Sequence, residues 1–176
     1  MATNLAFLRA INLGATRKFP KDAIVAATEA AGFTGVATHI NTGNVRLDTT
    51  MRSRARIEAA LESSYLQDRG FEVPTIVLTP AELRAIVEEA GRLAPDHAGR
   101  HYVSVLKQEP EAAVADVLEA RSTPQERVHV AGRAVHLVLG ESYHEATLGN
   151  AVVERHLGVA TNRNLTVLRA LVQKWC

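Results

Sequence analysis

The sequence contains a single cysteine, Cys176, so no disulfide can form within the chain and a reducing compartment is expected. No stretch approaches the roughly 18 apolar residues of a membrane-spanning helix. The first residues, MATNLAFLRAINL, lack the cationic segment and apolar core of a signal peptide. We therefore predict a cytoplasmic protein with no membrane partner, either a monomer or a homodimer.

The net charge is also small, and aromatic residues are few. The formal net charge is +1 and aromatic residues make up 5% of the chain, so no strong overall field attracts nucleic acid. RNA-recognition modules stack bases on exposed aromatic side chains of their central strands. The strands expected at the centre of the first sheet, 4–10 and 44–49, offer only Phe7, which alternates with its neighbours as a core residue does. RNA or DNA binding is therefore disfavoured and kept as an alternative.

Catalytic and cofactor motifs are absent. The seven histidines show neither zinc-finger spacing nor the HExxH pattern, and there is no phosphate-binding Walker loop, dinucleotide fingerprint or GxSxG sequence. The sequence predicts no metal and no cofactor. It leaves open whether the protein is an enzyme.

The first half of the chain predicts the order βαββαβ. A buried strand at its start precedes a helix that Pro20 opens, and a hairpin turning at Thr42-Gly43 is followed by an amphipathic helix with Ser53 as N-cap. Pro74 indicates that the fourth strand lies at a sheet edge. The expected elements are strand 4–10, helix 20–33, strands 36–41 and 44–49, helix 53–70, strand 71–79 and a following helix 80–91.

The second half repeats this order in part. A strand at 101–107, a helix at 109–120, a hairpin over 126–140 and two helices at 145–158 and 163–176 give βαββα, with a terminal helix in place of the sixth element. We therefore predict an α+β fold of two ferredoxin-like modules packed side by side. The first module spans 1–91 with its additional helix, and the second spans 101–176.

The predicted topology brings three polar loops to one end of the first sheet. We call them together the polar rim: residues 9–18, 41–44 and 68–71. A glycine-containing loop before a helix presents backbone N–H groups and a positive dipole end, which favours an anion. We predict a site for a small anionic or phosphate-bearing ligand. The candidate ligand-binding residues are Arg9, Asn12, Lys18, Asn41, Asn44 and Arg163.

Two other interpretations of the polar rim remain open. The asparagines satisfy turns and caps while the cations form a solvated surface, or the same loops serve an enzyme of specialised metabolism. Arg163 is a candidate because of the residues around it. Thr161, Asn162 and Asn164 are all good N-cap residues, which predicts that the last helix begins here and that Arg163 lies with its N-terminus at a phosphate. The alternative for Arg163 is a salt bridge that docks this helix.

Two histidines, His129 and His136, lie on opposite arms of the second hairpin. Their positions predict that the two side chains face each other across the paired strands. The simplest expectation is that both rings lie at the protein surface.

Four stretches resemble a bacterial protein family, domain of unknown function 1697. The family pattern runs LLRGINVGG, TYIQSGNVVF, FEVPVVVRS with ELRAIV, and ATTRNWNTVLKL. The corresponding stretches of this chain are FLRAINLGATRKFP (7–20), AGFTGVATHINTGNVRLDT (31–49), FEVPTIVLTPAELRAIV (71–87) and GVATNRNLTVLRAL (158–171).

The resemblance implies a two-module α+β fold and brings no established reaction. The chain departs from the family pattern in several places: Ala10 and Ala15 stand where it usually has glycine, NTGN (41–44) replaces QSGN, and Leu165 stands where it has tryptophan. Alanine restricts the backbone angles and adds a methyl group where a ligand would approach. The resemblance therefore supports the fold more strongly than it supports the ligand.

Overall fold

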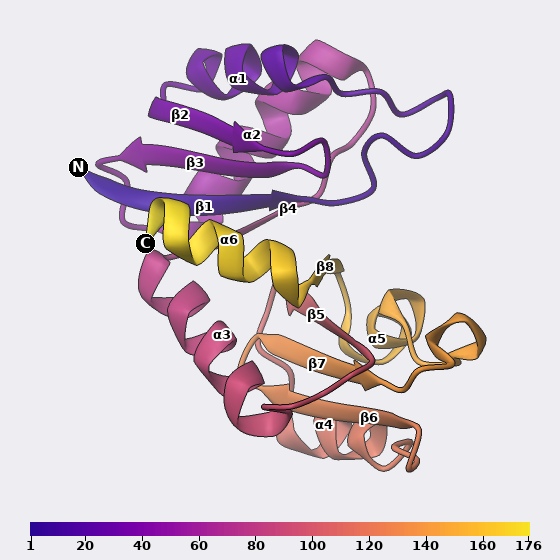
Figure 1. Cartoon of the computed structure of the whole chain (residues 1–176). Coiled ribbons are helices and arrows are strands. Elements are labelled where there is room, and N and C mark those ends of the chain that lie inside the picture. The colour runs from indigo at the N-terminus through magenta and orange to yellow at the C-terminus, as the bar shows by residue number, and fades with distance from the viewer. The chain divides into compact units, whose positions relative to one another are not determined.

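The computed structural model describes all 176 residues, which divide into two compact units, Met1–Pro80 with Trp175, and Ala81–Lys174 with Cys176. Each unit contains one four-stranded antiparallel sheet, and six α-helices complete an α+β fold (Figure 1). No helix is long and apolar enough to cross a membrane. The boundaries predicted from the sequence, 1–91 and 101–176, stay a prediction.

The first unit has the predicted element order. Its elements are β1 (Ala2–Leu8), α1 (Lys21–Ala30), β2 (Thr34–His39), β3 (Asn44–Thr49), α2 (Arg54–Arg69) and β4 (Thr75–Leu78). The strand order is β2-β3-β1-β4, so β4 lies at an edge, as Pro74 indicated. Two glutamates of α2 accept hydrogen bonds from this strand: Glu62 from Thr75 N at 2.8 Å and Glu58 from Val77 N at 2.9 Å.

The core of the first unit lies between its sheet and the helices α1 and α2 (Figure 1). Alternate residues of β1, Ala6 and Leu8, enter it, as the period of two in a strand requires. Phe19, which ends the loop after β1, packs edge-to-face on Tyr65 of α2 with 5.2 Å between ring centroids. Both rings are fully buried. The loop is therefore anchored in the core at its far end.

The second unit begins with α3 (Pro80–Leu93), whose first residue closes the first unit. Its other elements are β5 (Arg100–Leu106), α4 (Ala112–Glu119), β6 (Glu126–Ala131), β7 (Ala134–Leu139), the 3-10 turn η1 (Tyr143–Glu145), α5 (Asn150–Leu157), β8 (Ala160–Asn164) and α6 (Leu165–Trp175). The strand order is β6-β7-β5-β8. A core of apolar side chains lies under α4 and α5, including Leu118, Leu137 and Val153.

The prediction that the second unit lacks a sixth element is wrong. β8 pairs antiparallel with β5 from Tyr102↔Asn164 to Leu106↔Ala160, so the order βαββαβ is complete and α6 follows it. Of the three candidate caps, only Asn164 caps α6, accepting from Thr166 N at 2.9 Å. The polar residues at 161–163 belong to the strand.

Candidate functional site

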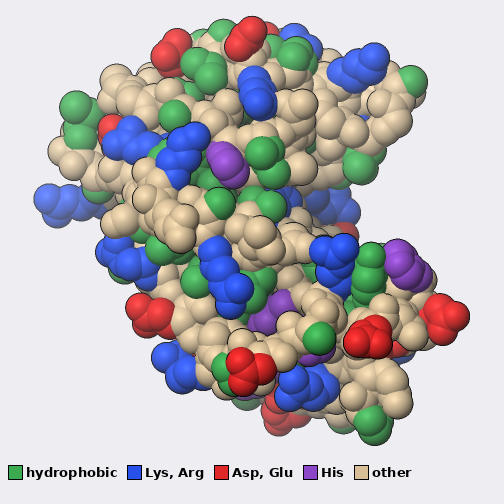
Figure 2. Space-filling view, in the orientation of Figure 1, with side chains coloured by type: hydrophobic (Ala, Val, Ile, Leu, Met, Phe, Trp, Pro, Cys, Tyr) green, Lys and Arg blue, Asp and Glu red, His purple; other side chains and the backbone are tan.

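The three loops of the polar rim lie together, as the predicted topology required. Leu8 N donates to Gly43 O at 2.8 Å, which joins the end of β1 to the hairpin between β2 and β3. Arg9 N donates to Pro74 O at 2.9 Å, which joins it to the segment before β4. Figure 2 shows Lys or Arg side chains at the end of the first unit that carries the β1–α1 loop.

Asn12 closes the loop after β1. Its Oδ1 accepts from Phe19 N at 2.9 Å, and its Nδ2 donates to Phe19 O at 3.2 Å and to Asn41 O at 2.8 Å. The backbone of Asn12 is left-handed, with φ 55°, a conformation that asparagine tolerates better than most residues. The interpretation of this asparagine as a turn residue therefore holds, and its amide positions Asn41.

Asn44, another candidate, is fully buried at the start of β3. Its Nδ2 donates to His39 O at 3.1 Å and to Thr42 Oγ1 at 2.9 Å, so it braces the hairpin from within. The side chain has no exposed surface with which to contact a ligand.

Arg17, a cation of the loop 9–18 that is not among the six candidate residues, holds the rim together. Its Nε donates to Ala10 O at 2.6 Å and its Nη2 to Glu72 O at 2.6 Å, while the guanidinium lies over the ring of Phe71, 4.6 Å from the centroid. Ala10 itself has φ 56°, in the region that glycine favours. The glycine that the resemblance places at this position fits this backbone geometry. Arg9, beside it, is half-buried.

A pocket remains beside these braced loops, where α1 begins. Lys18, Lys21 and Asn41 line it with exposed side chains, and Asp22 is the only acidic residue among its lining. The residue before α1 is Pro20, which carries no N–H and offers no side-chain cap to the first turn. The N–H groups of that turn therefore face a surface that carries two lysines.

Arg163 does not belong to this pocket. It lies in β8 of the second unit and is 7% exposed, and its Nη1 donates to Thr161 Oγ1 and Asn162 O, both at 2.8 Å. Burial lowers the pKa of its guanidinium to about 10. The structure gives Arg163 a structural role within the sheet in place of the predicted place at a helix N-terminus.

The predicted histidine pair is present, but the expectation that it lies at the surface is wrong. His129 and His136 are directly opposite across β6 and β7, with 6.2 Å between ring centroids. His136 is fully buried and is joined by His101 of β5, whose Nε2 lies 3.1 Å from His136 Nδ1. No group of three or more His, Cys, Asp or Glu side chains is placed to hold a metal ion.

The comparisons with known proteins bear on the family and the fold. A family model described as "Protein of unknown function (DUF1697)" matches residues 1–136. The solved structure of a conserved bacterial protein, SP0830 from Streptococcus pneumoniae, is similar with a TM-score of 0.79 and 20% sequence identity. The match covers 99% of this chain and 98% of that chain. At this identity the likeness shows the fold alone. No curated protein matches the chain.

Proposed function

The chain belongs to the DUF1697 family of proteins of unknown function, and from that premise we propose that its first unit binds a small anionic or phosphate-bearing ligand at the polar rim. The observation that supports the proposal is the pocket at the start of α1. Two lysines, Lys18 and Lys21, share it with uncapped N–H groups of a ten-residue helix, and a single carboxylate, Asp22, opposes them. Such a helix terminus favours negative charge through its dipole and its outward N–H groups.

The hydrogen bonds of the rim divide the original candidates by role. We assign ligand contact to Lys18 and Asn41, and add Lys21, because all three line the pocket. Asn12 positions Asn41, and Asn44 braces the hairpin without contacting ligand. Rigid support of this kind lowers the entropy cost of binding, because the loops are ordered before the ligand arrives.

Removal of both lysines tests the proposal. Phosphate and a panel of phosphorylated metabolites are screened by thermal shift and then by calorimetry against the full chain. The double variant Lys18→Ala/Lys21→Ala is expected to weaken binding of a hit at least about tenfold, since charged hydrogen bonds contribute roughly 1.5–3 kcal/mol each. The matched control, Arg52→Ala/Arg56→Ala, removes the same charge from exposed residues of the same unit. Equal weakening in the two double variants would show only a general charge effect and would reject this site.

We also propose that each unit is a ferredoxin-like module, with the modules spanning 1–91 and 101–176. Both units have the order βαββαβ, and in both the first strand lies inside the sheet next to the last. Expression of the two segments separately tests the boundaries, because an independent module would give a dispersed NMR spectrum by itself. RNA or DNA binding gains no support, since Phe7 is fully buried.

A further inference from the structure

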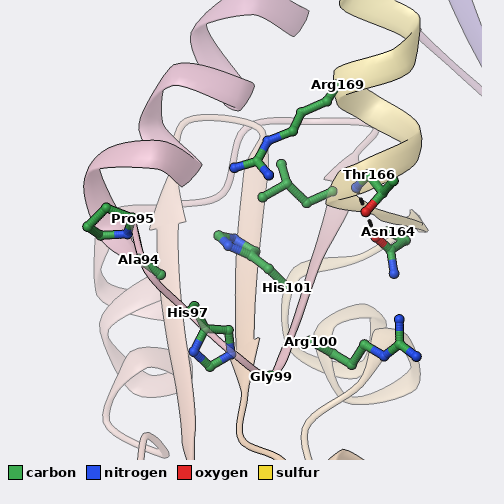
Figure 3. Close-up of a pocket in the computed structure, with 10 residues that line it drawn as sticks. Ala94, Pro95, His97, Gly99, Arg100, His101, Asn164, Thr166 and Arg169 are labelled. Carbon is green, nitrogen blue, oxygen red and sulfur yellow. Dashed lines mark hydrogen bonds between the residues drawn. The ribbon is translucent and has the colours of Figure 1, made fainter.

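The second unit contains a separate, more enclosed pocket of about 170 Å³. It lies between the loop that precedes β5, the end of β8 and the first turns of α6 (Figure 3). Its polar lining includes His97, Arg100, His101, Thr166 and Arg169, and no acidic residue is among its lining. A polar, acid-free hollow with several cationic or N–H-bearing side chains has the character of an anion site.

Arg169 is the principal cation of this pocket. It extends from α6 toward the ring of His101 (Figure 3), and no carboxylate pairs with it. Arg100 is engaged at the mouth, where its guanidinium lies 4.8 Å from the ring centroid of Tyr143 and its Nη2 donates to the Tyr143 hydroxyl at 3.3 Å. Neither arginine is neutralised within the protein, so the positive charge is available to a ligand.

His101 provides a second and independent observation. The side chain is 7% exposed and lines the pocket, and its Nε2 is taken by His136 Nδ1. Its other nitrogen, Nδ1, is buried and has no hydrogen-bond partner in the protein. Buried polar atoms are hydrogen-bonded in the great majority of cases. An orphaned nitrogen on a ring that lines a cationic pocket therefore indicates a partner that the protein does not supply.

Two further features support binding in the same place. His97 donates from Nε2 to Leu139 O at 2.6 Å, which fixes the orientation of its ring. The N-terminus of α6 opens at the pocket, with Asn164 as N-cap and the Thr166 hydroxyl in the lining. The dipole of this eleven-residue helix adds positive potential at that end.

The size of the pocket limits what it can hold. A cavity of about 150 Å³ accommodates one benzene molecule, so this pocket suits a group of about five or six heavy atoms and excludes a whole nucleotide. A phosphoryl group has that size, and its oxygens match the donors of a guanidinium fork. We propose that this pocket binds a phosphoryl group, as inorganic phosphate or as the end of a small phosphoester, through Arg169, His101 Nδ1–H and the N-terminus of α6.

Binding would also select one arrangement of protons in the histidine pair. To donate to the anion, His101 must carry its proton on Nδ1, and Nε2 must then accept from His136 Nδ1–H. Both rings remain neutral and no proton is released. Ligand binding would thus be detectable in two ways, as a measured affinity and as a change in which ring nitrogen of His101 is protonated.

The experiment uses inorganic phosphate and the full-length protein. Calorimetry compares the parent with Arg169→Gln, and with Arg155→Gln as a control that removes an exposed arginine from another helix of the same unit. We expect Arg169→Gln to weaken phosphate binding about tenfold and Arg155→Gln to leave it unchanged. Long-range ¹H–¹⁵N spectra should show His101 becoming Nδ1-protonated on addition of phosphate. Glycerol phosphate in place of phosphate distinguishes a phosphoester end from the free ion.

With the polar rim removed by Lys18→Ala/Lys21→Ala, phosphate binding that survives the further change Arg169→Gln, or that weakens equally with Arg155→Gln, overturns the proposal, as does a His101 signal that ignores saturating phosphate. The double variant Lys18→Ala/Lys21→Ala separates this site from the polar rim. It should retain the Arg169-dependent binding and the His101 response, so either site can fail while the other stands.

Discussion

The buried histidine pair predicts that the protein loses stability over a defined range of mild acidity. Burial lowers the pKa of both His101 and His136 to about 4 from the ordinary 6.5. The charge of His136 adds most to the lowering at His101, followed by those of His97, Arg169 and Arg127. At His136 the charge of His129 adds to the lowering, whereas Glu89 opposes it. Between the folded-state pKa of about 4 and the unfolded-state pKa of 6.5, the unfolded chain binds more protons than the folded chain. The free energy of unfolding must therefore fall as the pH falls through that range.

The magnitude follows from the two pKa values. For one ring with a folded pKa of about 4 and an unfolded pKa of 6.5, linkage gives a loss of roughly 2 to 3 kcal/mol between pH 7.5 and pH 4.5. Two carboxyl groups also have lowered pKa values: Glu89 through its hydrogen bond from Arg92, and Glu126 through the N–H of Thr147. Their contribution to the free energy of unfolding is present at any pH above the pKa that these carboxyl groups have in the unfolded chain. It is lost only as the pH falls below about 4.5. The interval from 6.5 to 4.5 therefore reports the histidines.

Urea denaturation at half-unit pH steps measures this loss, in buffers without phosphate so that no ligand stabilises the folded state. In His136→Gln one titrating ring is gone, and the loss in this interval should shrink to half or less. His144→Gln, which removes an exposed histidine of η1, should reproduce the parent curve. A parent stability that is flat from pH 6.5 to 4.5, or a full loss in His136→Gln, would show that the pair does not carry the effect.

Three substitutions in the first unit test its packing by the same urea assay. Ala10→Gly should stabilise by about 0.5–1 kcal/mol, because it relieves the left-handed backbone at φ 56°; a loss would mean that Ala10 carries no strain. Tyr65→Phe should cost about 1 kcal/mol, because its hydroxyl meets Thr28 Oγ1 at 2.8 Å; no change would mean that this bond does not contribute. Glu58→Ala removes the carboxylate that accepts from Val77 N and should cost about 1–3 kcal/mol, whereas Glu58→Gln, which keeps an acceptor, should cost less; equal losses would contradict the assignment.

The sequence predicted the first unit well because its signals are local. A continuous apolar run marks β1 and apolar alternation marks β3. Gly70 ends α2 with φ 73°, and Pro74 marks the edge. The strand β8 was missed for a physical reason. Its residues, ATNRN, include three good N-cap types just before a helix, and their burial depends on pairing with β5, more than fifty residues earlier. Nothing in this five-residue stretch, four of whose residues are polar, reveals such a partner.

In the polar rim too, the positions of the loops could be predicted from topology, whereas their hydrogen bonds could not. Antiparallel order alone brings the loops at 9–18 and 41–44 to the same end of the sheet, and this was predictable. The individual hydrogen bonds were not. Whether Asn12 faces solvent or closes its loop depends on the position of Phe19, and Phe19 is fixed by Tyr65 in the core. Of several polar residues that look alike in sequence, packing leaves only some exposed to a ligand.

The histidine pair carries this argument furthest, since its chemistry depends on contacts across three strands. Two neutral rings hold two protons on four nitrogens, and the bond between His101 and His136 uses one proton and one lone pair. The outer nitrogens, His101 Nδ1 and His136 Nε2, must then be one donor and one acceptor, and neither has a partner in the protein. Whatever binds His101 Nδ1 therefore fixes the opposite character at His136 Nε2, in the ring that tilts against His129. A phosphoryl oxygen at the first nitrogen makes the second an acceptor, so occupancy of the pocket would be transmitted to the far arm of the hairpin without any movement of the backbone.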